Sequence, residues 1–328
     1  MAIADDLQGR WYGNRAPPWW TRPLACSYGG VTAARRWMYR RGWLRSERLP
    51  VPVIVVGNIV AGGAGKTPLA IALVEALRAR GYKPGVVSRG YGGAARAPML
   101  LDAQPDPATV GDEPALIRAR TGASVAIGAK RIQAARLLLP EGVDVVIADD
   151  GLQHYALARD IEICVVDGLR RFGNGRLLPA GPLREPALRL RDVDFIVYNG
   201  GEARSGEIAM RLVLGDAVNL ATSASASLAT FAGRRVHAVA GIGHPPRFFA
   251  ALRASGIDLI EHPFPDHHRY ASGDLAFGDG LPVLMTEKDA VKCRAFAGNH
   301  WWGVPVTAEL PAGFFDAVVA RIALRQHA

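Results

Sequence analysis

The sequence is poor in cysteine, since its 328 residues include only Cys26, Cys164 and Cys293. These three are odd in number, widely separated and never in a Cys-x-x-Cys spacing, which argues against a disulfide framework and against a zinc site. Long apolar runs are also missing, because no stretch reaches the ~18 apolar residues that a membrane-spanning helix needs. We therefore expect a protein folded around hydrophobic cores in a reducing compartment, without a span across a bilayer.

The chain also lacks a secretory start. Asp5 and Asp6 stand where a signal peptide carries basic residues, and no uninterrupted apolar segment follows them. We find no internal repeat and no long low-complexity tract. We expect a cytoplasmic protein, and with 49% hydrophobic content the chain is long enough for two domains of ordinary size.

Positive charge is in excess and unevenly spread. The formal net charge is +9, and the first fifty residues hold nine arginines against three acidic residues. The same segment holds five of the seven tryptophans, Trp11, Trp19, Trp20, Trp37 and Trp43. Because Trp and Arg together favour a membrane-water boundary, residues 1–48 are predicted to form a basic, Trp-rich arm on an anionic membrane surface. The alternative is a solvated basic helix whose tryptophans pack on the domain behind it, since the arginines between residues 35 and 41 do not gather on one helix face.

After this arm, apolar runs alternate with helical patterns. Strands are predicted at residues 51–56, 85–88, 124–127, 143–148, 161–166 and 195–198. This alternation predicts an α/β fold with a largely parallel sheet covered on both faces. We predict a main domain at 49–205, a small and polar connector at 206–232, and a smaller C-terminal α/β domain at 233–328.

The segment "VPVIVVGNIVAGGAGKTPLA", residues 51–70, joins an apolar strand to a helix and carries Gly-Lys-Thr, the context of a phosphate-binding loop. The residues predicted to surround the nucleotide phosphates are Val60, Ala61, Gly62, Gly63, Ala64, Gly65, Lys66 and Thr67. Lys66 would reach the outer phosphates of ATP, and the Thr67 hydroxyl would bind Mg²⁺. Val60 stands where the usual motif has its first glycine, which costs little if the strand enters the turn with room for a side chain. Residues 49–205 are thus predicted to be a P-loop NTPase domain, the alternative being a glycine-rich turn that carries Lys-Thr by chance.

A second apolar strand, in "VDVVIADDGLQH", ends in Asp149 and Asp150. The end of such a strand delivers both carboxylates to the sheet edge where the phosphates would lie. One of the two is predicted to ligate Mg²⁺, and the other would bind the metal through water or hold it from the second shell. Without the phosphate loop, we would interpret the two aspartates as ordinary turn residues.

A kinase also needs a group that accepts the proton of the substrate hydroxyl. Asp112, in "VGDEPAL", precedes a predicted helix and is either this base or an ordinary N-cap with Pro114 in the first turn. His267 follows Asp266 in "FPDHHRY", where the carboxylate could orient the imidazole for proton transfer, although exposed histidine pairs are common. The stretch "TEKDAVK", residues 286–292, either binds substrate or caps the helix that follows.

Residues 167–191 connect two predicted strands and are too many for a simple connection. Long loops in compact domains tend to be functional. This one carries six arginines, Arg170, Arg171, Arg176, Arg184, Arg189 and Arg191. Because the guanidinium fork binds phosphate in bidentate fashion, the loop suits a phosphorylated or otherwise anionic substrate. We interpret Arg189 and Arg191 as part of a solvated basic helix.

Seven motifs, in the order "GNIVAGGAGKTP", "SRGYGG", "GDEP", "DDGLQH", "GNGRLLPAGPLREP", "FPDHH" and "TEKDAVK", closely resemble the tetraacyldisaccharide 4'-kinases, the lipid A 4'-kinases of Gram-negative bacteria. The resemblance extends from about Leu24 into the last third of the second domain. It implies transfer of the γ-phosphate of ATP to the 4'-hydroxyl of a tetraacylated glucosamine disaccharide 1-phosphate, which forms lipid IVA in lipid A biosynthesis. It also implies peripheral binding to the cytoplasmic face of the bacterial inner membrane.

The resemblance implies roles for individual residues. Lys66 and Thr67 would bind phosphate and Mg²⁺, and Asp149 with Asp150 would serve the metal and the phosphates. Asp112 would pair with His267 as a proton-accepting dyad, and Arg184 would lie near the reacting phosphate; these are the catalytic residues expected here, together with Lys66. A residue other than glycine at position 60 is tolerated in that family.

Two other classes of protein remain as alternatives. A nucleotide-driven switch or metallochaperone ATPase would use the same loop to change shape without group transfer, and would need a partner-facing switch, often with metal ligands. A nucleic-acid-binding protein would account for the basic charge, but the charge is concentrated with tryptophans in one arm and no nucleic-acid-binding module is recognisable. No nucleic acid partner is therefore expected.

Overall fold

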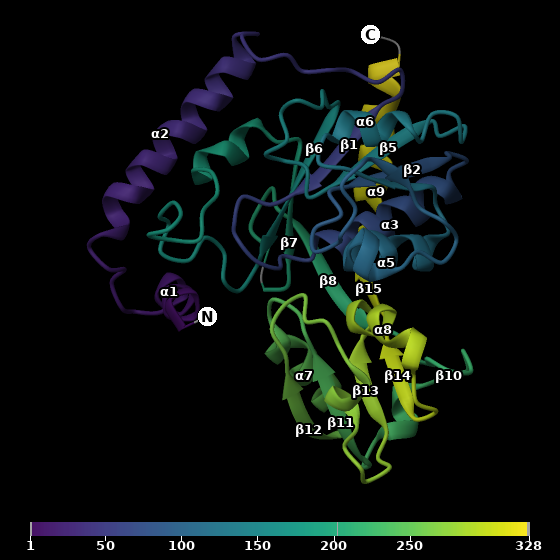
Figure 1. The fold of residues 1–328 in the computed structure, drawn as a ribbon. Helices are drawn as coiled ribbons and strands as arrows, with labels where there is room; N and C mark the ends of the chain where they lie inside the picture. Colours follow the sequence, from purple (N-terminus) through teal and green to yellow (C-terminus); the bar gives the residue numbers. More distant parts are fainter. Residues whose placement is uncertain (1, 202, 327–328) are drawn as a thin grey trace.

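The computed structural model describes residues 2–201 and 203–326, which form two α/β lobes with an amino-terminal arm along the side of the larger lobe (Figure 1). The larger lobe contains a nine-stranded sheet with the strand order β15-β8-β7-β6-β1-β5-β2-β4-β3. The smaller lobe contains a six-stranded sheet with the order β10-β9-β14-β13-β11-β12. The predicted α/β class with a largely parallel sheet is thereby confirmed.

The large sheet is parallel except at its two edges. Its parallel strands are β1 (Val53–Gly57), β2 (Pro84–Ser88), β4 (Val125–Ile127), β5 (Val145–Asp149), β6 (Ile161–Asp167), β7 (Phe195–Asn199) and β8 (Ile208–Leu214). The antiparallel edges are β3 (Met99–Leu100) and β15 (Val306–Glu309). Every residue of β1 is buried, because alternate side chains enter cores on opposite faces of the sheet, which explains the continuous apolar run in the sequence.

Helices cover both faces of this sheet. One face carries α3 (Lys66–Ala79), α5 (Asp112–Thr121) and α9 (Ala312–Gln326). The short helix α4 (Pro107–Val110) directly precedes α5 in the chain. The other face carries α6 (Arg131–Arg136) and the long segment that contains the 3₁₀ helix η1 (Ala187–Asp192). The carboxyl ends of the parallel strands face the smaller lobe, so the loops that follow them begin on that side (Figure 1).

The smaller lobe is a compact sheet flanked by short helices. Its strands are β9 (Ala217–Asn219), β10 (Ser225–Ala226), β11 (Arg235–Ala240), β12 (Asp258–Pro263), β13 (Val283–Thr286) and β14 (Trp301–Val304). Its helices are α7 (Pro245–Ala254), α8 (Glu287–Cys293) and the 3₁₀ turns η2 (Leu228–Phe231), η3 (Ser272–Leu275) and η4 (Arg294–Phe296). Strands β12, β11, β13 and β14 are parallel neighbours, as the alternating strand and helix pattern indicates.

The predicted domain boundaries are wrong in two places. Strand β8 lies within the predicted connector 206–232, yet it pairs with β7 as part of the large sheet. Strand β15 and helix α9 lie within the predicted domain 233–328, yet β15 pairs with β8 and α9 packs into the core of the larger lobe. The chain therefore leaves the larger lobe after β8 and returns before β15, and the two crossings are joined by a hydrogen bond from the Gly215 amide to the Pro305 carbonyl, 2.9 Å.

The arm consists of α1 (Ala2–Tyr12) and α2 (Thr21–Arg40), and α2 runs along the larger lobe (Figure 1). Trp11 is packed, with 8% of its surface exposed and its indole nitrogen donating to the Pro179 carbonyl. Trp19 and Trp43, by contrast, are 80% and 70% exposed. Of these three tryptophans of the arm, one packs against the larger lobe and two are exposed to solvent. Within the described residues, no helix is both long and apolar enough to cross a membrane.

Candidate active site

The predicted phosphate-binding loop connects β1 to α3. Gly65 is the N-cap of α3 and has φ 95°, and Gly62 has φ 103°, conformations that favour glycine. Two buried asparagines hold the loop: Asn58 donates to the Gly62 carbonyl at 3.1 Å, and Asn199 donates to the Ala64 carbonyl at 3.0 Å. With its carbonyls held in this way, the loop and the first turn of α3 present backbone N-H groups suited to an anion.

Val60 lies in an extended segment rather than in the tight part of the loop. It forms a bridge with Leu183, flanked by hydrogen bonds from the Ala61 amide to Pro182 at 2.8 Å and from the Arg184 amide to Ile59 at 2.7 Å. The Val60 side chain is 7% exposed and packs in the core, so this position needs no glycine. The same pairing positions Arg184 beside the phosphate-binding loop.

Asp150 is held between two cations at this loop. Its carboxylate lies 3.6 Å from the Lys66 ammonium and 3.3 Å from the Arg184 guanidinium. Burial alone would raise the pKa of Asp150, but the Lys66 and Arg184 charges outweigh it and hold this pKa below its usual value. The structure thus brings together three residues that the sequence placed in separate motifs.

Asp149 has a different environment, although it is the neighbouring residue. It ends β5 level with Val56 of β1, directly before the phosphate-binding loop, and it is fully buried. Neither carboxylate oxygen has a hydrogen-bond partner among the described residues. Burial, reinforced by the charges of Glu113 and Asp150, raises the pKa of Asp149 to about 7. A buried carboxylate with free acceptors is costly in isolation, and a nearby cation would relieve that cost.

These residues fit a magnesium ion. Among the residues that the structure describes, no group of three or more His, Cys, Asp or Glu could hold a metal. Mg²⁺, however, commonly takes one or two carboxylates and completes its octahedron with water and substrate phosphates. The orphaned oxygens of Asp149 and the hydroxyl of Thr67, at the second residue of α3, supply the protein oxygens that such a site requires.

Asp112 and His267 meet across the two lobes. Asp112 is the first residue of α5 in the larger lobe, and His267 lies in the loop after β12 in the smaller lobe. The His267 Nδ1 and the Asp112 Oδ2 are 3.1 Å apart. The N-cap of α5 is Gly111, and no side chain caps the helix, so the alternative reading of Asp112 as an N-cap is wrong. Its carboxylate is available for chemistry.

Lysines of α8 set the charge around Asp112. Burial by itself would raise the pKa of the Asp112 carboxyl. The hydrogen bond from His267 and the positive charges of Lys292 and Lys288 outweigh burial, so this pKa is below its usual value. Lys292 lies 3.7 Å from Asp112 and 2.7 Å from the buried Asp289. Asp112 is therefore ionised near neutral pH and able to accept a proton.

The "TEKDAVK" segment has the capping role that was one of the two open for it, and it also joins the two lobes. The Thr286 side chain accepts a hydrogen bond from the Asp289 amide and so caps α8. Lys288 lies 3.5 Å from Glu113 of the larger lobe and 3.2 Å from Asp266 of its own lobe. The cap orients α8, and the lysines connect the lobes at the Asp112 site.

The lobes also meet at the phosphate-binding loop itself. A methyl group added to Gly243 of the smaller lobe would lie 3.1 Å from the Gly63 nitrogen and 3.5 Å from an Asp266 oxygen. Two further contacts join this region: Asp167 binds Arg247 of α7 in the smaller lobe at 3.0 Å, and Arg170 donates to the Gly63 carbonyl at 2.8 Å. The loop that carries His267 is therefore adjacent to the phosphate-binding loop.

Sequence reasoning missed some of these residues and misread one. Asn199 and Asp167 were not predicted as site residues. Each is a polar residue at the end of a buried strand, and this pattern could have indicated them. The interpretation of Arg189 as solvated is wrong, because this side chain is 3% exposed and binds Glu162 at 2.5 Å. It is held in the larger lobe by a buried ion pair, whereas Arg170 and Arg184 from the same segment reach the phosphate-binding loop.

Replacing Lys292 should change how activity depends on pH. Lys292→Met removes a positive charge that lowers the pKa of Asp112, so this pKa rises and Asp112 becomes protonated at a higher pH. We expect the acidic limb of the kcat profile to move upward by roughly one pH unit. Lys292→Arg keeps the charge and should leave the limb near its original position, and an unmoved limb in Lys292→Met would contradict this account.

The fold and the site define a two-lobed P-loop protein in which a carboxylate-histidine pair is assembled beside the phosphate-binding loop. The family model described as tetraacyldisaccharide-1-P 4'-kinase matches residues 17–323, so this chain belongs to that family. A tetraacyldisaccharide 4'-kinase of Xanthomonas euvesicatoria pv. vesicatoria (strain 85-10) is 54% identical, covering 96% of this chain and 95% of the relative. One of Stenotrophomonas maltophilia (strain R551-3) is 55% identical, covering 95% of each chain.

A solved structure agrees with this placement. The crystal structure of LpxK from Aquifex aeolicus in complex with ATP has a TM-score of 0.78 to this chain at 28% identity. The match covers 92% of this chain and 97% of the other. The similarity therefore includes both lobes.

Proposed function

We propose that this protein transfers the γ-phosphate of ATP to the 4'-hydroxyl of a tetraacylated glucosamine disaccharide 1-phosphate, forming lipid IVA in lipid A biosynthesis. The observation that carries the proposal is the pairing of Asp112 with His267 beside a loop that carries Lys66. A nucleotide switch would need the loop, but it would not need a proton acceptor paired with a histidine of the opposing lobe. Family membership supplies the substrate class.

The phosphate-binding loop holds the nucleotide in this proposal. Backbone N-H groups of residues 62–67 and the Lys66 ammonium bind the phosphates, and Arg184 stabilises the charge of the group in transfer. The Ala61 N-H takes no part, because it already donates to the Pro182 carbonyl. Thr67 and Asp149 would hold Mg²⁺, and Asp150 keeps Lys66 and Arg184 in place. When bound, the ion neutralises charge on the outer phosphates.

Asp112 accepts the proton of the substrate hydroxyl. As the 4'-oxygen bonds to the γ-phosphorus, its O–H bond breaks, the proton goes to Asp112, and the bond from the γ-phosphorus to the ADP oxygen breaks. His267 fixes the orientation of the carboxylate through the 3.1 Å contact. Closure of the smaller lobe therefore completes the base, since His267 and Lys292 both come from that lobe.

The arm places the enzyme on the cytoplasmic face of the inner membrane as a peripheral protein. The acyl chains of the substrate are in the bilayer, so a membrane contact brings the disaccharide to the cleft. Trp19 and Trp43 are exposed on this arm, which also carries most of the excess positive charge. Aromatic side chains and arginines of this kind favour the boundary between lipid and water.

Substitution of the exposed tryptophans tests the membrane contact. Trp19→Ser/Trp43→Ser should weaken partition into membranes at least ~10-fold, because two large apolar side chains are replaced by small polar ones. Deletion of residues 1–23 is a less specific test of membrane contact, because it also removes Trp11, which packs against the 173–182 segment of the larger lobe. Partition is measured by flotation with vesicles, and unchanged partition would favour an arm that merely packs on the lobe.

The transfer reaction itself is tested with ATP radiolabelled at the γ-phosphate, Mg²⁺, detergent and a tetraacyldisaccharide 1-phosphate. Label should appear in the lipid. Release of free phosphate without labelled lipid would overturn the kinase assignment in favour of an ATPase switch.

A further inference from the structure

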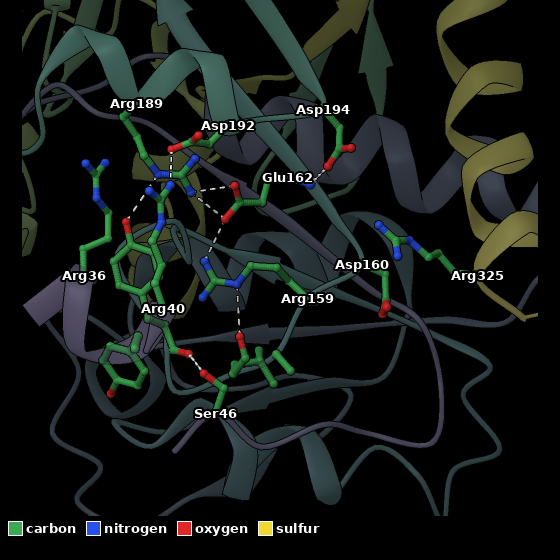
Figure 2. Close-up of a pocket in the computed structure, with 14 residues that line it drawn as sticks. Arg36, Arg40, Ser46, Arg159, Asp160, Glu162, Arg189, Asp192, Asp194 and Arg325 are labelled. Carbon is green, nitrogen blue, oxygen red and sulfur yellow. Dashed lines mark hydrogen bonds and ion pairs between the residues drawn. The ribbon is translucent and has the colours of Figure 1, made fainter. Parts of the chain in front are cut away.

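A cavity lined by charged side chains lies between α2 of the arm and the larger lobe (Figure 2). It has a volume of about 480 Å³ and is bounded by α2, the 155–162 segment, η1 and the end of α9. Asp160, in its wall, accepts a hydrogen bond from the Val53 amide at the amino end of β1, whereas the phosphate-binding loop follows the carboxyl end. The cavity is therefore separate from the nucleotide site, and its volume is in the ~300–1,000 Å³ range of small-ligand sites.

The carboxylates of this cavity are already neutralised. Each is ion-paired: Asp160 with Arg48, Glu162 with Arg159 and Arg189, Asp192 with Arg40, and Asp194 with Arg321. Arg36 and Arg325 also line the cavity, and neither has a carboxylate partner within the described part of the chain. The wall therefore has positive charge in excess, which favours an anion.

Arg189 provides a second and independent sign of a missing ligand. Its side chain is 3% exposed and lines the cavity, with Nη2 bound to Glu162 and Nε bound to the Tyr155 hydroxyl. Its Nη1 is buried and has no hydrogen-bond acceptor among the described residues. Leaving a buried donor of a charged group unpaired is costly, so the site as built calls for an acceptor.

The mouth of the cavity indicates where this acceptor comes from. Arg36 and Arg40 are one helical turn apart on α2, and Trp37 lies between them in sequence. Trp37 is 45% exposed and its ring contacts Trp43, which is 70% exposed, with the ring centroids 4.7 Å apart. Exposed tryptophans beside arginines place this end of α2 at the depth of lipid headgroups.

We propose that this cavity binds the phosphate of an anionic phospholipid headgroup, at a site distinct from the one where the substrate is phosphorylated. Arg36 and Arg325 bind the phosphate oxygens from opposite walls, and Arg189 donates from the floor, in the way that guanidinium groups bind phosphate. The inference rests on the membrane contact proposed above. It gives α2 a fixed anchoring point in addition to its general attraction to the membrane.

The test measures binding to phosphatidylcholine vesicles with and without phosphatidylglycerol, in the absence of substrate. Arg36→Gln/Arg325→Gln removes the two unpaired arginines, and Arg15→Gln/Arg22→Gln removes the same charge from exposed positions of the arm outside the cavity. We expect the cavity variant to bind phosphatidylglycerol vesicles about tenfold more weakly than the matched variant. Phosphate transfer in detergent without phospholipid should be unchanged in both.

Three results would overturn the proposal. Equal losses in the two variants would mean general attraction of positive charge to the membrane without a site. Competition by inorganic phosphate, present in wild type and absent in the cavity variant, would mean that the occupant is a soluble anion. Absence of vesicle binding by the wild-type protein, with transfer in detergent intact, would reject the membrane contact while the kinase assignment stands.

Discussion

Asp112→Asn should lower kcat at least ~100-fold, the loss expected when a general base is removed, while ATP still binds. The amide keeps the size of the carboxylate but cannot accept the hydroxyl proton. Its oxygen can still accept the hydrogen bond from His267, 3.1 Å away in the native protein, so the lobes should still close. Transfer of radiolabelled phosphate and nucleotide affinity, measured on the same preparation, separate chemistry from binding.

Asp106→Asn is the matched control for this substitution. Asp106 caps the neighbouring helix α4 by accepting from the Ala108 amide at 3.0 Å, and asparagine is an equally good N-cap. Its turnover should stay close to that of the wild type. Near-normal turnover of Asp112→Asn would show that this carboxylate only supports the contact between the lobes.

Lys66→Ala is expected to reduce phosphate transfer by ~10²–10³, the range found when one preorganised charge stabiliser is removed. Lys66 is the only lysine of the phosphate-binding loop, and its side chain is nearly buried, with 11% of its surface exposed. Folding should survive, because Arg184 remains 3.3 Å from Asp150 and keeps that carboxylate paired. Single-turnover transfer with the labelled nucleotide measures the loss.

Lys83→Ala provides the comparison for this loss. Lys83 directly precedes β2, and its ammonium binds only the Glu141 carbonyl in the described contacts. Lys83→Ala should leave transfer unchanged. If Lys66→Ala retained most of the wild-type rate, the loop would be a structural turn and the proposed charge stabilisation would have to come from Arg184 alone.

The two largest effects come from two helices of the larger lobe, α3 and α5, that act on the two reacting groups. Lys66 acts on the phosphate and Asp112 on the hydroxyl, and both act in the same transition state. Residues that act as a unit are strongly non-additive, so the double variant should lose less than the product of the two single losses.

Local pattern in the sequence determined much of this protein. Buried parallel strands appear as continuous apolar runs, and the phosphate-binding loop and the Asp149-Asp150 pair each follow such a run, because the carboxyl ends of parallel strands meet at one edge. The ordered motifs indicated the family. These features depend on residues that are neighbours in the chain, so they can be read without knowing how distant segments pack.

Only the tertiary structure decided the features that join distant segments. It returned β15 to the large sheet, placed Val60 in an extended pairing with Leu183, and buried Arg189 against Glu162. The family resemblance implied the pairing of Asp112 with His267, but no local pattern did, and the structure brings the two within 3.1 Å from different lobes. None of these has a local signal, since a carboxylate that caps a helix and one that meets a histidine look alike in sequence. The difference lies in which partner the fold brings within hydrogen-bonding distance.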